Sequence, residues 1–252
     1  VGGKLIDQIS LSDRSSVDRH LDQAIKHRPE LILLAGGTEG GASRAVLKTA
    51  ELIQSLCQLI PQGKRPVVLY TGNQAIAPRV EALLKDLTLV FSVAHLRPSI
   101  EQENLAPAQY TLAEIMASIR TQQGAGLENA AQNSHLPLLP SSYTFGRTFR
   151  YLSLANPRSQ LPVLGIDVGS DYTVVADAFK GDLRLNVLPY GVGGGIDNTL
   201  NILPLEEVLR WLPADIHPAM ARDYLYQKVL FPNALPITEE TASLPPIILG
   251  LI

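Results

Sequence analysis

The sequence contains little of what secreted, nucleic-acid-binding and membrane-spanning proteins have in abundance. Its 252 residues include one cysteine, Cys57, so the chain cannot form a disulfide within itself. Lys and Arg number 21 against 24 Asp and Glu, and the net charge of −3 predicts no basic surface for a polyanion. No apolar run reaches the length of a membrane span, and no leader pattern opens the sequence. We therefore expect a cytoplasmic protein that binds neither nucleic acid nor a membrane.

The two ends of the sequence suggest that it is an internal fragment of a longer protein. It begins at Val1 without a methionine, and residues 246–252 have the apolar composition of a buried strand. We expect such a fragment to be inactive alone.

The first part of the chain, residues 1–155, alternates short apolar runs with amphipathic segments. Apolar strands are expected at residues 31–35, 65–70 and 87–93. Helices are expected at residues 13–28, 42–59, 76–85 and 111–123, the last with Thr111 and Glu114 as its capping box. Strand, glycine turn and helix in succession predict a parallel βαβ subdomain.

The second part, residues 156–252, opens with the pattern of an antiparallel meander. Apolar strands precede and follow a short polar turn at residues 169–172, and a third strand is expected at residues 183–187. Helices are expected after residue 195, at 206–212 and at 217–230. The join between the two parts, residues 122–160, is rich in Gly, Asn, Ser and Pro, with a helical tendency at residues 145–154.

A glycine-rich loop, residues 36–41, lies where a predicted parallel strand meets the next helix. Backbone amides at such a carboxyl edge favour anionic ligands, which makes Gly36, Gly37, Thr38 and Glu39 candidate cofactor-binding residues. The spacing matches neither the dinucleotide fingerprint nor a nucleoside-triphosphate loop. Glycines that serve only a tight strand-to-helix turn are the structural alternative.

A second candidate site is the turn between the first two strands of the meander. Asp167 could hold a cation such as Mg²⁺, while the turn amides could form an anion nest. The residues involved would be Asp167, Gly169, Ser170, Asp171 and Thr173. An ordinary hairpin with polar turn residues is the alternative.

A third glycine cluster, which includes Gly193, Gly194 and Gly195, could wrap the phosphates or the ribose of a nucleotide. The five histidines show no ligand spacing with one another or with Cys57, so we expect no tightly bound metal. No residue pattern identifies a catalytic nucleophile.

Three segments resemble the MutL family encoded beside adenosylcobalamin-dependent glutamate mutase, which is distinct from the mismatch-repair protein of the same name. Residues 31–41 resemble its LLxGGTDGG segment, residues 67–73 its PVVxAGN strand, and residues 164–175 its DIGGATTD phosphate segment. The resemblance implies the fold of the actin-like ATPase superfamily, with Hsp70, sugar kinases and FtsA. The second part of the chain would then be a ribonuclease-H-like, actin-type subdomain.

The resemblance also implies a function. The intact protein would bind ATP and Mg²⁺ and act as a chaperone-like accessory or reactivating factor for the subunits of a cobalamin-dependent mutase. The superfamily's first phosphate hairpin would lie before Val1, and its adenosine-binding loop after Ile252. The sequence does not indicate an oligomeric state.

Two departures from the family pattern bear on ATP hydrolysis. Ser170 replaces the family's second glycine, and Val174 stands where an acid is expected after Thr173. They predict at most a weak ATPase. One alternative is a non-catalytic actin-fold scaffold or protein-interaction module. Another is a small-molecule enzyme working at the edge formed by residues 36–41.

Overall fold

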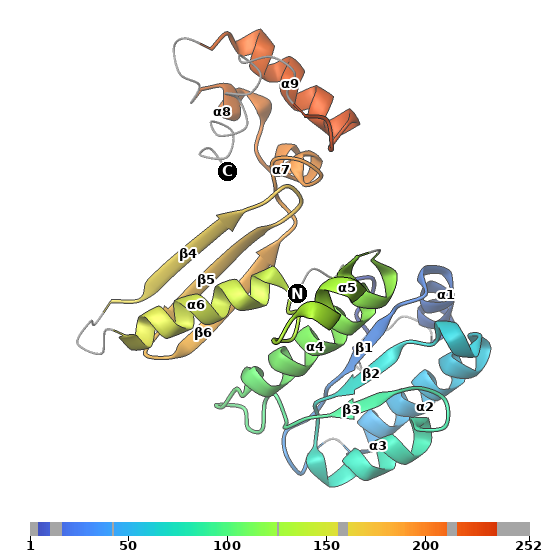
Figure 1. Ribbon diagram of the computed structural model, residues 1–252. Helices are drawn as coiled ribbons and strands as arrows, with labels where there is room; N and C mark the ends of the chain where they lie inside the picture. Colours follow the sequence, from blue (N-terminus) through green and yellow to red (C-terminus); the bar gives the residue numbers. More distant parts are fainter. Residues whose placement is uncertain are drawn as a thin grey trace. The chain divides into compact units, whose positions relative to one another are not determined.

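The computed structural model describes residues 5–10, 17–41, 43–124, 126–155, 161–210 and 216–235. The chain divides into two compact units, residues 1–140 and 141–252 (Figure 1). The division precedes helix α6 (Ser141–Ala155), which packs on the meander of the second unit. The strand expected at residues 246–252 lies outside the described residues.

The first unit contains the predicted parallel sheet. Its strands β1 (Leu31–Leu34), β2 (Val67–Tyr70) and β3 (Val90–Ser92) lie in the order β1-β2-β3. Leu31 pairs with Val67 and Val68 pairs with Val90, both in parallel register. The connecting helices are α2 (Ser43–Leu59) and α3 (Ala77–Leu84), and α1 (Val17–His27) precedes β1. The predicted βαβ alternation is therefore confirmed.

The core of this unit lies between the sheet and helices α2 and α3. Val68 and Tyr70 on β2 are fully buried against apolar residues of both helices, including Ala50 and Val80. Leu69 alternates to the other face of the sheet, where α4 (Leu105–Gln123) contacts β2. A central strand that is buried on both faces explains why its sequence is apolar throughout.

Helix α4 begins six residues before the predicted start, so the predicted capping box was wrong. Its N-terminal flanking residue is Asn104, and Thr111 lies inside the helix. Pro107 falls in the first turn, where a missing amide proton costs no helical hydrogen bond. A short helix, α5 (Leu127–Asn133), follows in the segment that the sequence suggested as a join.

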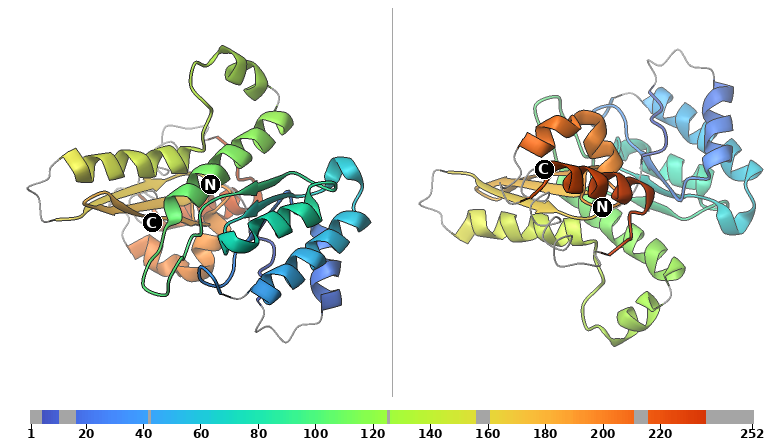
Figure 2. Two further views of the ribbon diagram at one scale, coloured as in Figure 1. Left: turned by 90° about the horizontal axis from the view of Figure 1, so that it is seen from below. Right: turned by 90° about the horizontal axis from the view of Figure 1, so that it is seen from above.

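The second unit begins with α6 and the predicted antiparallel meander. Strands β4 (Val163–Val168), β5 (Thr173–Phe179) and β6 (Asp182–Leu188) form a sheet in chain order. Val168 pairs with Thr173 across the first turn, and Phe179 pairs with Asp182 across the second. Figure 2 shows α6 lying along one face of this sheet.

Close packing of α6 depends on small residues on both sides of the contact. Any side chain at Gly165 would collide with the ring of Phe149, and one at Gly146 would meet Leu185. The C-terminal part of α6 lies beside the second turn, where Arg150 Nε donates to the carbonyl of Gly181 over 2.8 Å. The N-terminal end of α6 therefore lies toward the opposite end of the sheet, where the first turn is found.

Three helices follow the sheet: α7 (Ile196–Ile202), α8 (Leu205–Arg210) and α9 (Pro218–Leu230). They share a small apolar core that includes Ile196, Val208 and Leu225. The His217 ring caps α9 by accepting a hydrogen bond from the amide of Ala219 over 3.2 Å. All three helices were expected, within a few residues at their ends.

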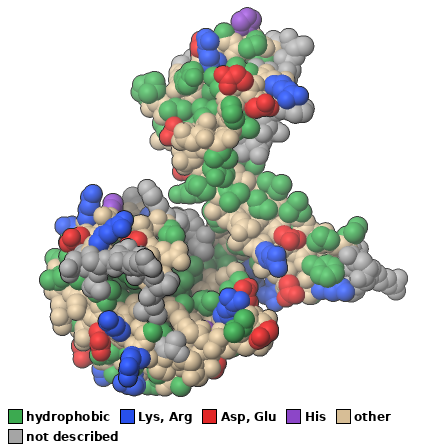
Figure 3. Space-filling view, turned by 180° about the vertical axis from the view of Figure 1, so that it is seen from behind, with side chains coloured by type: hydrophobic (Ala, Val, Ile, Leu, Met, Phe, Trp, Pro, Cys, Tyr) green, Lys and Arg blue, Asp and Glu red, His purple; other side chains and the backbone are tan. Residues whose placement is uncertain are grey.

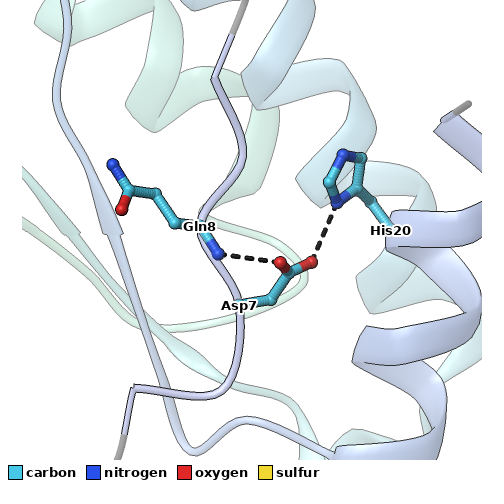
Figure 4. A network of polar contacts seen from close by, with 3 residues as sticks. All are labelled: Asp7, Gln8 and His20. Atoms are coloured by element: carbon cyan, nitrogen blue, oxygen red, sulfur yellow. Dashed lines mark hydrogen bonds and ion pairs between the residues drawn. The ribbon is translucent and has the colours of Figure 1, made fainter. Parts of the chain in front are cut away.

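The surface shows no concentration of one kind of charge on the face drawn in Figure 3, where acidic and basic side chains are interspersed. None of the helices in the described part of the chain combines the length and the apolar composition that a membrane crossing needs. Near the start of the chain, Asp7 joins α1 through a 2.8 Å contact between its Oδ2 and His20 Nδ1 (Figure 4).

Candidate functional site

Two glycine-rich loops fold over strand ends, one in each unit. The candidate residues Gly36, Gly37, Thr38 and Glu39 follow β1 in the first unit. The other candidates, between residues 167 and 195, lie at one end of the antiparallel sheet in the second unit. We describe the two sites separately.

In the second unit, the 191–195 loop closes directly onto the turn between β4 and β5. The amides of residues 192, 193 and 195 donate to the carbonyls of Gly169 and Ser170 over distances of 3.1, 2.8 and 3.0 Å. The amide of Gly194 donates to Ser170 Oγ over 3.3 Å. The structure thus brings together two segments that are separated in sequence, but the glycine-loop amides bond to protein oxygens.

The glycines of this loop permit an unusually close approach between two backbones. A Cβ atom at Gly191 would collide with the carbonyl group of Ser170, and one at Gly195 with the carbonyl oxygen of Asp171. Backbone atoms cannot move aside as a flexible side chain can. Packing is therefore a sufficient reason for glycine at both positions.

Where the 191–195 loop meets the β4–β5 turn, which together we call the double loop, the Asp167 carboxylate and two turn amides have no hydrogen-bond partner among the described residues. Within the described part of the chain, nothing donates a hydrogen bond to the exposed Asp167 carboxylate. The amides of Ser170 and Asp171 likewise bond to no acceptor among the described residues. Asp167 shares the α6-covered face with Gly165, because alternate residues of a strand lie on one side. An acceptor and two donors are thus available to a ligand.

Two buried threonines brace the double loop. Thr173, a predicted phosphate contact, is 6% exposed, and its hydroxyl donates to the carbonyl of Tyr190 over 2.8 Å. Thr199, which we did not predict, accepts from the amide of Gly191 over 3.3 Å and donates to the carbonyl of Gly195 over 3.0 Å. A hydroxyl one turn after a glycine cluster is the only sequence signal that could have indicated this role.

In the first unit, the 36–41 loop lies across the carboxyl edge of the parallel sheet. The Glu39 amide donates to the carbonyl of Pro98 over 2.9 Å, after β3. The Glu39 carboxylate accepts from the Gln74 amide over 2.9 Å, after β2. Gly37 and Gly40 adopt left-handed backbone angles, with φ of 71° and 74°, which side-chain-bearing residues adopt at a cost. Because its carboxylate accepts from the Gln74 amide, Glu39 already has a partner within the protein.

Beneath this loop the end of β2 is polar but buried. Asn73 is 1% exposed, and its side chain donates to the carbonyl of Gly41 over 3.0 Å and accepts from the Ala75 amide over 3.0 Å. The Tyr70 hydroxyl donates to the Asn73 carbonyl over 2.8 Å. Burial, assisted by the nearby negative charge of Glu39, raises the pKa of Tyr70 to about 12.

A comparison with models of protein families identifies the family to which the chain belongs. The MutL protein family model matches residues 1–245. The chain belongs to the MutL family. No curated protein and no solved structure matches it.

The chemistry open to this MutL-family protein differs between the two sites. No group of three or more His, Cys, Asp or Glu side chains in the described residues is placed to hold a metal ion. A Mg²⁺ ion does not need such a group, since it is commonly held by one or two carboxylates together with substrate phosphates and water. The carboxylate of Asp167, which has no partner in the part of the chain that the structure describes, fits that requirement, whereas Glu39 is engaged by Gln74.

Proposed function

We propose that this MutL-family protein binds ATP with Mg²⁺ at the β4–β5 turn and serves as an accessory or reactivating factor for a cobalamin-dependent mutase. The observation that carries the proposal is that the Asp167 carboxylate and the turn amides of Ser170 and Asp171 have no hydrogen-bond partner among the described residues. Membership of the MutL family supports the biological role. The proposal includes the actin-type fold for the second unit.

The turn would act by complementary charge. The amides of Ser170 and Asp171 would donate to phosphate oxygens, while Asp167 would hold Mg²⁺ directly or through its water shell. The N-terminal end of α6, on the Asp167 side of the sheet, adds a favourable field for an anion. Gly193, Gly194 and Gly195 would line the nucleotide through their Cα atoms, since all three of their amides bond to Ser170.

Hydrolysis would be slow in this protein. Val174 is 7% exposed and apolar at the position where the family pattern has an acid, so it can neither orient water nor hold a metal. Asp171 and Asp177 are the nearest acids in sequence, each three residues away, and Asp171 Oδ1 already accepts a hydrogen bond from Ser170 Oγ over 3.1 Å. We therefore propose that nucleotide binding, more than turnover, biases the protein between two states that a mutase subunit distinguishes.

The test is calorimetric titration of the protein with ATP in the presence of Mg²⁺. We expect binding, and we expect Asp167→Ala to weaken it at least tenfold, or about 1.4 kcal/mol. Asp182→Ala is the matched control, because it removes an exposed aspartate from the opposite end of the same sheet. Equal affinities for the two variants, or no binding by the wild-type protein, would refute the nucleotide site.

A non-catalytic scaffold is the second candidate. The observation in its favour is that the amides of residues 192–195 are satisfied by Gly169 and Ser170, as they would be in a loop without a ligand. A protein that binds a cobalamin-dependent mutase subunit equally well with and without Mg²⁺ and ATP would support this alternative.

A further inference from the structure

A buried polar group that the proposed nucleotide site does not use lies in the first unit. His95 follows β3 and is 4% exposed. Its Nδ1 accepts a hydrogen bond from the amide of Arg97 over 3.0 Å, so the ring proton is on Nε2. Nε2 is itself buried, and no atom of the described residues accepts its hydrogen bond.

The residues on either side of His95 are tied to the other two strand ends. The hydroxyl of the buried Thr71 donates to the carbonyl of Ala94 over 3.0 Å, at the end of β2. Pro98 accepts from the amide of Glu39 in the 36–41 loop, which follows β1. His95 is therefore enclosed where the ends of all three parallel strands meet, the edge at which open α/β sheets usually bind ligands.

A buried donor of this kind requires an acceptor. Nearly all buried polar groups in folded proteins are hydrogen-bonded to protein, water or ligand. Two neighbouring features favour an anion as the acceptor. Helix α2 begins directly after the 36–41 loop and has no acidic residue in its first turn. The hydroxyl of Thr38 in that loop has no partner among the described residues.

We propose that the carboxyl edge of β1, β2 and β3 binds a small oxyanion, a carboxylate or a phosphate group, whose oxygen accepts a hydrogen bond from His95 Nε2. The 36–41 loop covers the ligand, and Thr38 is its second polar contact. Glu39 holds the loop in place through Gln74 and Pro98. This site involves the first unit alone, so the proposal for it is tested independently of nucleotide binding at Asp167.

The histidine resonances of the intact protein provide the test. In protein labelled with ¹⁵N-histidine, sodium acetate and inorganic phosphate are titrated separately at constant ionic strength. We expect a saturable shift of the His95 Nε2 resonance with at least one of the two anions. A response to acetate alone identifies a carboxylate site, and a response to phosphate alone identifies a phosphate site.

His217 is the internal control, because its Nδ1 also accepts from the amide two residues later but its ring is exposed. Equal shifts of the His95 and His217 resonances would indicate a non-specific ion effect and overturn the proposal. An unresponsive His95 whose Nε2 proton exchanges only with water would also overturn it, because a buried water would then be the acceptor.

Two substitutions separate a ligand contact from a purely structural role. His95→Gln keeps a donor near the Nε2 position, whereas His95→Phe removes it. Followed through the amide resonances of Thr38 and Gln74, the anion titration should have a midpoint at least tenfold higher in His95→Phe, with recovery in His95→Gln. Equal midpoints in both variants would contradict the proposal. If His95→Phe does not fold, the wild-type titration still decides.

Discussion

Two glycine-rich loops of this protein look alike in sequence but differ in which groups they leave available. In the first unit, the 36–41 loop uses the carboxylate of Glu39 to bind Gln74, above a buried polar layer. In the second unit, the 191–195 loop uses its amides to bind the β4–β5 turn, and no described residue donates a hydrogen bond to the carboxylate of Asp167. The acid of the first site is bound by the protein, whereas the acid of the second site, on β4, is available to a ligand.

The difference shows that an acid beside glycines does not by itself indicate a metal site. What matters is whether the fold already supplies a donor to the carboxylate. The partner of Glu39 is 35 residues away in sequence, and this long-range contact is set by the pairing of β1 with β2. The following predictions test each side of this comparison, from the largest expected effect to the smallest.

The close approach of the 191–195 loop to the β4–β5 turn should be the feature most sensitive to substitution. Gly195→Val would place Cβ against the carbonyl oxygen of Asp171, and we expect a loss of about 3 kcal/mol in unfolding free energy. Urea unfolding, with amide hydrogen exchange to localise the change to β4–β6, would measure it. Gly63→Ala is the control, because a Cβ there meets nothing within 4 Å. Equal losses would show that the loops do not pack closely.

The buried polar layer of the first unit should depend on Asn73. Asn73→Ala removes the hydrogen bonds to Gly41 and Ala75 and leaves buried groups unpaired, so we expect a loss of about 2 kcal/mol. Glu39→Gln keeps an acceptor oxygen for the Gln74 amide and should cost under about 0.5 kcal/mol. Chemical denaturation of both variants is the measurement. A larger loss for Glu39→Gln would mean that the charge of Glu39 has a role beyond its hydrogen bond.

Tyr70 should make the first unit sensitive to alkaline pH. Its pKa is raised from 10.0 to about 12 in the folded protein, so its contribution is complete below pH 10 and is lost as the pH rises toward 12. The expected loss is roughly 1–2 kcal/mol. Unfolding free energies of the wild-type protein and Tyr70→Phe should therefore converge between pH 10 and 12. The exposed Tyr226 offers the control, and convergence for Tyr226→Phe as well would contradict the assignment to Tyr70.

The contact between Asp7 and His20 should give the smallest effect, at acidic pH. The hydrogen bond with His20 is the main reason why the pKa of Asp7 lies below its ordinary value of 3.8. Its stabilising contribution is therefore present above that value and lost as the pH falls through the lower, folded-state pKa. For a partly exposed pair we expect under about 1 kcal/mol. Asp7→Asn should reduce the acid sensitivity of unfolding, and Asp22→Asn, on the helix that carries His20, should not.

The regular elements were the most predictable part of the fold. Apolar runs and turn residues identified all six described strands, because their periodicity is local information. Helix α4 was misplaced because Thr111 and Glu114 imitate a capping box inside the helix, whereas Asn104 caps no amide with its side chain. Helix α6 was only partly anticipated, since its glycine and serines resemble a linker in sequence, and the packing of Leu185 against Gly146 is visible only in the structure.

The sites were less predictable than the elements. The sequence predicted a site at Asp167 and the turn that follows it, and it suggested that the 191–195 loop would belong to the same region. It could not show that Ser170 would engage the loop amides, or that Thr199 would brace the loop from α7. These contacts depend on how the loops fold against each other, and no local pattern encodes them.

The most direct test of the contrast between the two loops uses Mn²⁺ with ATP as a paramagnetic probe of the ¹⁵N-labelled protein. Mn²⁺ bound at Asp167 should broaden the amide resonances of Ser170 and Asp171, and Asp167→Ala should abolish the broadening. Broadening centred on Glu39 and Gln74, or none at Ser170 and Asp171, would contradict the assignment of Asp167 as the available acid.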